Sequence, residues 1–339
     1  MIKKLLFLLV LLLTATTGAM AQTTYKVSVK EGTEDANKWE IAPAEATTTG
    51  VAAGTTVTAT YSGTRKVKSV KAVKKVDPKL ATPMTIEAIT AGSINVANPK
   101  EGMQYSKNGG AKTSVTTSID VAAGDKVQFY GNGTSITCYG DPKTSKCTQI
   151  TGSGDGFTCK VYGNIMSLVD EENFATATTL SAESTFNRLF FGNPTLTDAS
   201  GLLLPATQLQ ESCYREMFSN CTALTAAPAL PATQLAMHCY REMFNSCYAL
   251  TAAPVLPATK LVDYCYQSMF NYCSNLATVT CLATSGINKN NNNSTSYWLN
   301  NAGSAVQGTK TVYTVNKANW PSLDFTVIPD GWTLVNIDN

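Results

Sequence analysis

The chain has 339 residues, of which 44% are hydrophobic and 15% charged, and its formal net charge is +2. This length predicts two or three domains, and the near-neutral charge gives no argument for a nucleic-acid or acidic partner. We expect no nucleic-acid partner. The single histidine, His238, argues against catalytic triads and zinc enzymes, because both classes depend on imidazole groups.

The first residues are typical of an export signal. Lys3 and Lys4 precede the unbroken apolar run Leu5–Leu13, and Ala19-Met20-Ala21 fits a small-residue cleavage site, so that the mature chain begins at Gln22. No later run reaches the roughly 18 apolar residues that span a bilayer. We therefore expect an exported protein without a transmembrane segment, which is held at the cell surface, stays in the periplasm or is secreted.

Two β-rich modules are predicted next. Short alternating runs punctuated by glycine between Tyr25 and Val73 indicate a small antiparallel β module. Pro83–Tyr162 has the pattern of a β-sandwich. Its strand candidates are Thr85–Ala88, Ser93–Val96, Ser118–Val121, Lys126–Tyr130, Ser135–Tyr139 and Thr158–Tyr162. The Ala122–Asp125 segment predicts a tight hairpin between two of these strands.

The second half of the chain contains three copies of one 26-residue unit. They begin at Leu204, Leu230 and Leu256, and the starts differ by 230 − 204 = 26 and 256 − 230 = 26. Repeats of roughly 20–29 residues are typical of leucine-rich repeats, which stack and expose a surface. One unit alone buries too little apolar area to offset the entropy of ordering it, so the copies must pack on one another.

Each copy predicts a short helix followed by an extended run. Cys213, Met217 and Cys221 are spaced i, i+4, i+8, which places them on one apolar stripe of a helix. Leu224 begins the extended run. The segment Thr185–Thr197 is a worn copy at an offset of 28, in which Phe186, Leu189, Phe190 and Leu196 match Tyr214, Met217, Phe218 and Leu224. A degenerate first copy is typical of a terminal cap.

The cysteines of the repeats form two ladders, Cys213/Cys239/Cys265 and Cys221/Cys247/Cys273. The favoured interpretation is that of buried, unpaired thiols within the core. Disulfides between rungs are an alternative, and a metal site is another, although the Cys-x7-Cys spacing does not suit zinc. Outside the repeats, Cys138 and Cys147 could close a hairpin. We expect no cofactor and no metal.

The unit LPATxL…CYxxMFxxCxxL resembles the repeats of BspA-like bacterial surface proteins, and the Tyr25–Val73 module resembles, more weakly, internalin-type B-repeats. The resemblance covers about Thr185–Cys281 and implies adhesion to proteins, glycans or cells. The chain departs from the family pattern at Ala226-Ala227-Pro228, because proline removes a backbone donor and predicts a short, shallow strand there.

The predicted fold class is therefore multidomain, with N-terminal all-β modules followed by a short, capped leucine-rich-repeat solenoid of the α/β type. The predicted divisions are a signal peptide (1–21), a small β module (22–80), a β-sandwich module (81–162), a repeat stack with its N-terminal cap (163–284) and a C-terminal cap (285–339). The C-terminal cap carries Trp298, Trp320 and Trp332.

Candidate binding residues lie where the three copies differ. The aromatic members of these positions are His238, Tyr248, Tyr264 and Tyr272. Exposed aromatic side chains on a fixed scaffold suit protein or sugar surfaces. Simple drift at solvated positions would produce the same variation.

No catalytic constellation is evident. Asp170, Glu171 and Glu172 are interpreted as an exposed helix start, and Glu216 and Glu242 as part of a solvated helix face. We therefore expect a monomeric, non-catalytic binding or adhesion protein with a protein or glycan ligand. The alternatives are a structural envelope component without a ligand, and a carbohydrate-binding accessory protein in which Trp39 or the Pro83–Tyr162 module contacts glycan.

Overall fold

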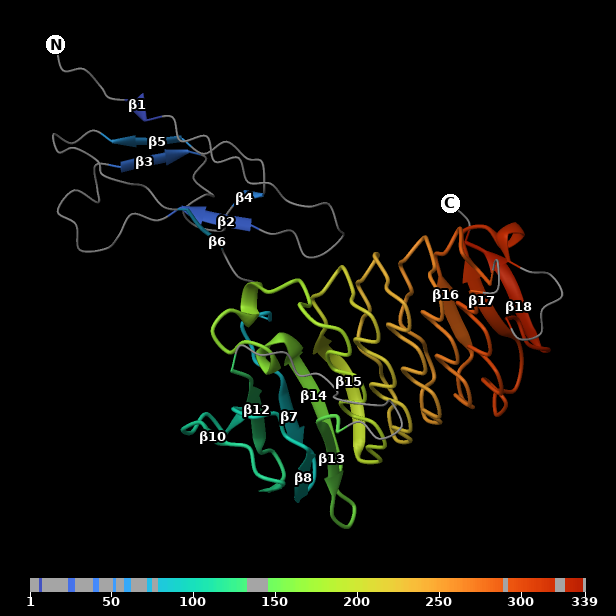
Figure 1. Ribbon diagram of the computed structural model, residues 1–339, viewed down its shortest axis with the longest axis horizontal. Helices are drawn as coiled ribbons and strands as arrows, with labels where there is room; N and C mark the ends of the chain where they lie inside the picture. Colours follow the sequence, from blue (N-terminus) through green and yellow to red (C-terminus); the bar gives the residue numbers. More distant parts are fainter. Residues whose placement is uncertain are drawn as a thin grey trace. The chain divides into compact units, whose positions relative to one another are not determined.

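The computed structural model describes residues 79–132, 146–288, 292–320 and 327–337, together with six short strands before residue 79 (Figure 1). The chain divides into two compact units, Met1–Pro78 and Lys79–Asn339. No helix in the part described is long and apolar enough to cross a membrane.

The strands of the first unit form two antiparallel three-stranded sheets, in the orders β1-β5-β3 and β4-β2-β6. They are β1 (Leu6–Phe7), β2 (Thr24–Val27), β3 (Trp39–Ala42), β4 (Val51–Ala52), β5 (Thr58–Tyr61) and β6 (Ala72–Lys74). The alternating runs between Tyr25 and Val73 predict a small antiparallel β module, and β2, β3 and β5 lie within that range. The export signal lies largely outside the described residues, apart from β1.

The second unit begins with two sheets, ordered β10-β9-β12-β7-β14-β15 and β11-β8-β13. Their strands are β7 (Thr85–Ala88), β8 (Gly92–Ala97), β9 (Gln104–Lys107), β10 (Thr113–Ser114), β11 (Ser118–Val121), β12 (Lys126–Tyr130), β13 (Gln149–Ser153), β14 (Cys159–Asn164) and β15 (Leu196–Leu203). Alternate residues such as Ile119, Val121, Val127 and Phe129 are buried in the core, as the pleat of a strand requires. The strand candidate Ser135–Tyr139 lies outside the described residues.

The predicted hairpin between β11 and β12 is wrong. The turn itself forms, since Asp125 N–H donates to Ala122 O at 3.1 Å and Gly124 supplies a φ of 86°. However, β11 pairs with β8, whereas β12 pairs with β7 and β9. The turn therefore carries the chain from one sheet to the other, which the local sequence cannot distinguish from a hairpin.

Parallel pairing runs through the repeats. β15 pairs in parallel with β14, and isolated parallel bridges continue the series at Asp198–Ala226 and Ala252–Thr278. The series ends in the parallel sheet of β16 (Thr278–Cys281), β17 (Lys310–Thr314) and β18 (Trp332–Asn336). The repeats therefore stack rung upon rung, as Figure 1 shows between β15 and β16.

The expected helix of each copy is absent. Residues 212–221, 238–247 and 264–273, which we call the turn ribbon, have a positive φ at every fourth residue instead. In the first copy these are Ser212, Glu216 and Asn220, at 55°, 54° and 60°. The matching positions are His238, Glu242, Ser246, Tyr264, Ser268 and Tyr272.

Backbone N–H groups of the turn ribbon alternate between two kinds of acceptor. Odd-numbered residues close turns within their own rung, as when Met217 N–H donates to Tyr214 O at 3.3 Å. Even-numbered residues donate to the next rung, as when Glu216 N–H donates to Arg241 O at 2.9 Å. Every backbone N–H of the turn ribbon is thus satisfied without an α-helix, but only if a neighbouring rung is present.

The predicted α/β leucine-rich-repeat solenoid is therefore wrong. In the described part of the chain the only helices are the 3₁₀ turns η3 (Ile165–Leu168), η4 (Phe174–Thr176) and η6 (Lys317–Asn319). The described strands form one six-stranded and four three-stranded sheets, and within the repeats the strand pairing between successive rungs is limited to isolated parallel bridges. The structure is mostly β.

The error has a physical reason. The buried positions of a copy, such as Cys213, Met217 and Cys221, recur every four residues. Two turns of an α-helix take about 7.2 residues, so over nine residues a helical stripe and a four-residue turn period differ by less than one position. The two patterns cannot be separated at that length.

Side chains at equivalent positions form columns through the stack. Phe190, Phe218, Phe244 and Phe270 stack face to face, with ring centroids 5.3, 5.5 and 5.7 Å apart. Stacked aromatic pairs of this kind contribute beyond their burial. The match between Phe190 and Phe218 also confirms the worn first copy, as does the stack of Phe186 on Tyr214 at 5.8 Å.

Both cysteine ladders consist of free, buried thiols, which confirms the favoured interpretation. In the second ladder Cys221, Cys247 and Cys273 donate S–H bonds of 3.0–3.1 Å to carbonyls of the preceding rung. Burial raises the pKa of Cys213 and of Cys273 to about 12, so the thiols stay protonated. Outside the repeats Cys147 is disulfide-bonded; its expected partner, Cys138, lies outside the described residues.

A further rung that the repeat pattern does not reveal follows the third copy. Phe270 N–H donates to Trp298 O at 2.8 Å and Tyr272 N–H to Asn300 O at 2.9 Å, which aligns 293–302 with the turn ribbon at an offset of 29. Trp298 then stacks on Trp320, with ring centroids 5.5 Å apart. These two tryptophans lie in the predicted C-terminal cap.

A glycine substitution distinguishes the turn ribbon from a helix. Ser268 has a φ of 52°, so Ser268→Gly relieves left-handed strain and should leave the free energy of unfolding unchanged or raise it by up to about 1 kcal/mol. Ser268→Val should lower it. The neighbouring Gln267→Gly serves as the control and should lower it by about 0.5–1 kcal/mol. Equal losses for both glycine variants in chemical denaturation would contradict the positive φ.

The contribution of the S–H hydrogen bonds to stability can be measured by comparing one cysteine from each ladder. Cys239 and Cys247 lie in the same rung and are both fully buried, but only Cys247 donates a bond, to Phe218 O at 3.1 Å. Cys247→Ala should therefore cost about 0.5–1 kcal/mol more than Cys239→Ala in the free energy of unfolding. Equal costs would show that the S–H bond contributes nothing.

Candidate binding surface

Two of the four candidate residues meet. His238 and Tyr264 occupy the same position of successive rungs, and their rings stack with centroids 4.8 Å apart and an interplanar angle of 19°. Both have a positive φ, at 58° and 57°, and both are half-buried. The pair forms a supported aromatic platform, because each backbone is fixed by the turn hydrogen bonds of its rung.

The other two candidates lie near the C-terminal end of the turn ribbon: Tyr272 within it and Tyr248 directly after Cys247. Tyr272 is 48% exposed and Tyr248 is 44% exposed, on either side of the buried Cys221/Cys247/Cys273 ladder. The backbone carbonyl of Tyr248 accepts a 2.8 Å bond from Asn275 Nδ2 of the next rung. The sequence alone does not show that these two tyrosines lie apart from His238 and Tyr264. In the structure, neither Tyr248 nor Tyr272 makes a ring contact with that pair.

Charged groups surround His238 unequally. Glu211 Oε1 lies 3.9 Å from His238 Nδ1 and favours the protonated imidazole. The positive charges of Arg241 and Arg215 disfavour it. Burial first, and then the two arginines, lower the pKa of His238, against an opposing effect of Glu211. The lowered pKa favours the neutral imidazole.

The carboxylates considered for chemistry serve the scaffold instead. Glu216 pairs with Arg215 at 3.0 Å and with Arg188 of the preceding rung at 3.2 Å. Glu242 pairs with Arg241 at 2.9 Å. Equivalent residues of adjacent rungs project from one face, so the two glutamates do not oppose each other across a cleft, as glycosidic chemistry requires.

The acidic segment at 170–172 begins a turn rather than the predicted α-helix. Asp170 Oδ1 accepts bonds from the backbone N–H groups of Glu172, at 2.9 Å, and Asn173, at 3.2 Å. The bond from the Asn173 side chain contributes most to lowering the pKa of Asp170. Glu171 pairs with Lys112 at 2.5 Å, so the carboxylates of Asp170 and Glu171 are both engaged in structural contacts.

The four candidate residues leave out several exposed apolar side chains of the stack, among them Met237 and Tyr297. Met237 is 38% exposed and Tyr297 is 51% exposed. Met237 stands where the copies differ, beside His238, so the variation itself was a usable signal. Tyr297 belongs to the additional rung. That rung follows at an offset of 29 rather than 26 and has different residues, so its similarity to the repeats is not evident from the sequence.

No group of three or more potential metal ligands occurs among the described residues. Searches against protein-family models, curated proteins and solved structures find no match to this chain. The resemblance to BspA-like surface repeats accordingly stays a prediction.

A pH titration tests the surroundings of His238. Because its pKa is lowered in the folded chain, the unfolded chain takes up the proton more readily. The free energy of unfolding should therefore be at its full value above pH 6.5 and fall as pH decreases below about 6.5.

His238→Asn removes the titrating group and retains a residue type that tolerates a positive φ. Denaturation midpoints measured between about pH 7.5 and 5.5 should then change less with pH than those of the unaltered chain. The same slope in both proteins would show that His238 is not responsible.

Proposed function

We propose that this chain is a non-catalytic binding protein that is exported and acts at the cell envelope or outside the cell. Its ligand is a protein or a glycan, and recognition is by the exposed face of the stacked rungs. The observation that carries the proposal is the exposure of Tyr248 and Tyr272 at positions where the copies differ. The N-terminal Lys3–Ala21 pattern supports export.

The rigidity of the rungs supports the same function. Tyr264 and Tyr272 each donate a backbone N–H to the next rung, at 2.9 Å in both cases. A side chain presented from a fixed backbone loses little additional freedom when a ligand binds. Tyrosine adds a large contact area together with a hydroxyl that can hydrogen-bond to protein or sugar groups.

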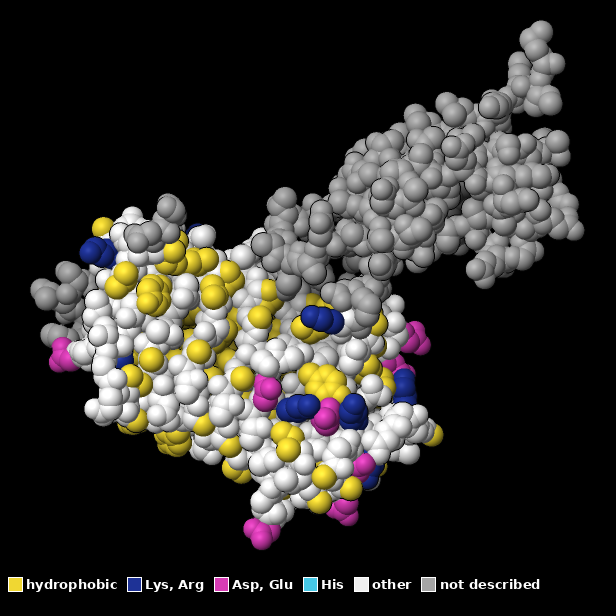
Figure 2. Space-filling model, turned by 180° about the vertical axis from the view of Figure 1, so that it is seen from behind, with side chains coloured by type: hydrophobic (Ala, Val, Ile, Leu, Met, Phe, Trp, Pro, Cys, Tyr) yellow, Lys and Arg dark blue, Asp and Glu magenta, His cyan; other side chains and the backbone are white. Residues whose placement is uncertain are grey.

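The charge distribution favours an uncharged ligand surface. Only Lys260, Asp263 and Lys289 are charged between residues 248 and 309. On the face shown in Figure 2, charged side chains gather over one part of the described unit, and much of the remaining surface is uncharged. Residues 248–309 are rich in asparagine, serine, threonine and tyrosine. These side chains suit neutral polar partners better than nucleic acid.

The test is a binding screen of the chain from Gln22 onward against a glycan array and a panel of matrix proteins. For a ligand found in that screen, replacement of Tyr248, Tyr264 and Tyr272 together by alanine should weaken binding at least about tenfold, because aromatic anchors dominate such interfaces. Unfolding curves of the variant establish that the stack is intact.

Tyr313→Ala is the matched control, because Tyr313 is exposed but lies on β17 rather than on the turn ribbon. It should bind as the unaltered chain does. Unchanged binding of the triple variant would refute recognition by these tyrosines, and the absence of any ligand together with co-purification of envelope polymer would favour a structural role.

A further inference from the structure

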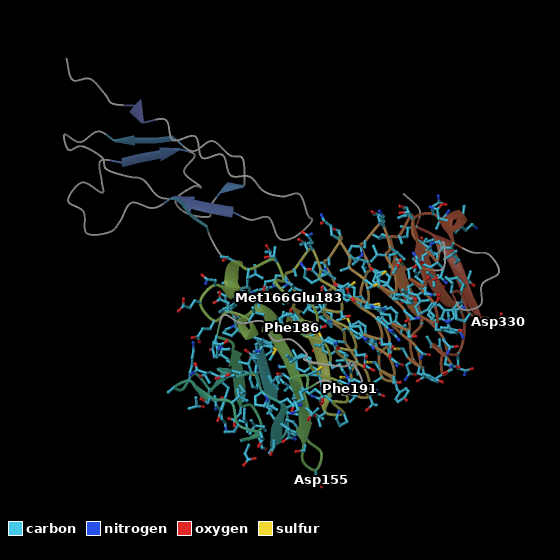
Figure 3. The ribbon with its side chains drawn as sticks, in the orientation of Figure 1. Asp155, Met166, Glu183, Phe186, Phe191 and Asp330 are labelled. Carbon is cyan, nitrogen blue, oxygen red and sulfur yellow. The ribbon has the colours of Figure 1, made fainter. Side chains whose placement is uncertain are left out.

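One interior position of the turn ribbon carries a hydroxyl group in four successive rungs. Tyr214, Tyr240 and Tyr266 occupy it in the three copies, and Thr295 occupies it in the additional rung. Their exposed fractions are between 0 and 1%. Phe186 fills the same position in the worn first copy and is labelled in Figure 3. We call the four hydroxyl-bearing residues the hydroxyl column.

None of the four side-chain oxygens of the hydroxyl column has a hydrogen-bond partner among the described residues. Hydroxyl groups buried without a partner are expensive, because they lose their bonds to water and gain none in return. Three or four such groups in one column would remove an appreciable part of the stability of a domain. A compensating interaction is therefore expected.

A phenyl ring would fit the position without that cost. Phe186 stacks on Tyr214 with centroids 5.8 Å apart and an interplanar angle of 11°. The tyrosine pairs have the same geometry, with centroids 5.7 and 6.1 Å apart and interplanar angles of 10° and 21°. Stacking alone thus gives no reason for a hydroxyl in the interior.

The spacing of the rings supplies a reason. Because successive tyrosine rings are nearly parallel, we expect the distance between their hydroxyl oxygens to be close to the distance between their ring centroids. Two successive O–H···O bonds of about 2.8 Å span about 5.6 Å, which is close to the 5.7 Å between the rings of Tyr214 and Tyr240. One water molecule between neighbouring hydroxyls would satisfy both.

The chemistry of the site suits water rather than an ion. Burial raises the pKa of Tyr214, Tyr240 and Tyr266 well above 10, so the hydroxyls are neutral and can both donate and accept. The neighbouring thiols, such as Cys213 and Cys239, are free and buried, and the described residues contain no group of three or more potential metal ligands that would hold a cation. A buried water needs two to four polar partners, and two hydroxyls meet the minimum.

We propose that the hydroxyl column holds a file of ordered water molecules inside the stack, one between the hydroxyls of each pair of successive tyrosines. The file links Tyr214, Tyr240 and Tyr266 by bonds that run along the stack, parallel to those of the backbone. It ends at Phe186, where the hydroxyl is missing. These waters exchange with solvent only when the rungs separate.

Tyr240→Phe in the full chain tests the proposal, because it removes one hydroxyl and changes no protein–protein hydrogen bond. If water bridges the column, the two adjoining waters each lose a partner, and Tm should fall by about 2–4 °C. A Tm that is unchanged or higher would show that the column is dry and overturn the proposal. Tyr248→Phe, at an exposed tyrosine, is the control and should leave Tm unchanged.

Two substitutions to tyrosine sharpen the test. Phe186→Tyr extends the hydroxyl column by one rung and should be tolerated, whereas Phe244→Tyr places a lone hydroxyl in the neighbouring all-phenylalanine column and should lower Tm. Equal losses from both would count against the file. In a high-resolution crystal structure of the full chain, density peaks are expected between the hydroxyls of Tyr214, Tyr240 and Tyr266, and their absence would overturn the proposal.

Discussion

The stack depends on hydrogen bonds from the backbone N–H groups of the turn ribbon, which donate alternately to acceptors in their own rung and in the next rung. Within a rung, every second N–H closes a turn, and the others donate to the neighbouring rung at 2.8–3.2 Å. A rung by itself would leave about half of these donors without a protein acceptor, and the neighbouring rung supplies those acceptors when it covers them. This requirement, rather than the apolar content of a single unit, makes the repeats dependent on one another.

The same constraint explains what lies at each end. At the beginning, β15 joins the parallel series to β14, so the first rungs grow directly from a sheet with its own core. At the other end the additional rung and the stack of Trp298 on Trp320 cover the last copy. Trp298 Nε1 also donates to Val327 O, which ties the final segment to the stack. Both ends keep the interior away from water.

Exact repetition turns single residues into columns, and each column has its own chemistry. Phenylalanine rings stack, the Cys221/Cys247/Cys273 thiols donate to carbonyls of the preceding rung, and tyrosines align their hydroxyls. At the worn first copy Asn193 replaces the cysteine and its amide donates to Ile150 O at 3.2 Å, which preserves the direction of the hydrogen bond although the residue differs. The three copies differ in sequence at surface positions. Among these, His238, Tyr264 and Tyr272 have a positive φ and project from a backbone that is fixed by hydrogen bonds.

The sequence by itself determined the repeat, its length, the worn copy at Thr185–Thr197, the buried thiol ladders and most strands between Thr85 and Tyr162. These follow from periodicity and from the need to bury apolar side chains, both of which are local or additive. Only the tertiary structure decided that the apolar stripe of each copy is a series of turns and not a helix, because the choice is made by hydrogen bonds between rungs. The same is true of the additional rung at 293–302, of the passage of Ala122–Asp125 between two sheets, and of the pairing of His238 with Tyr264. Each depends on which distant segment supplies the partner, and that information is not contained in any single stretch of the chain.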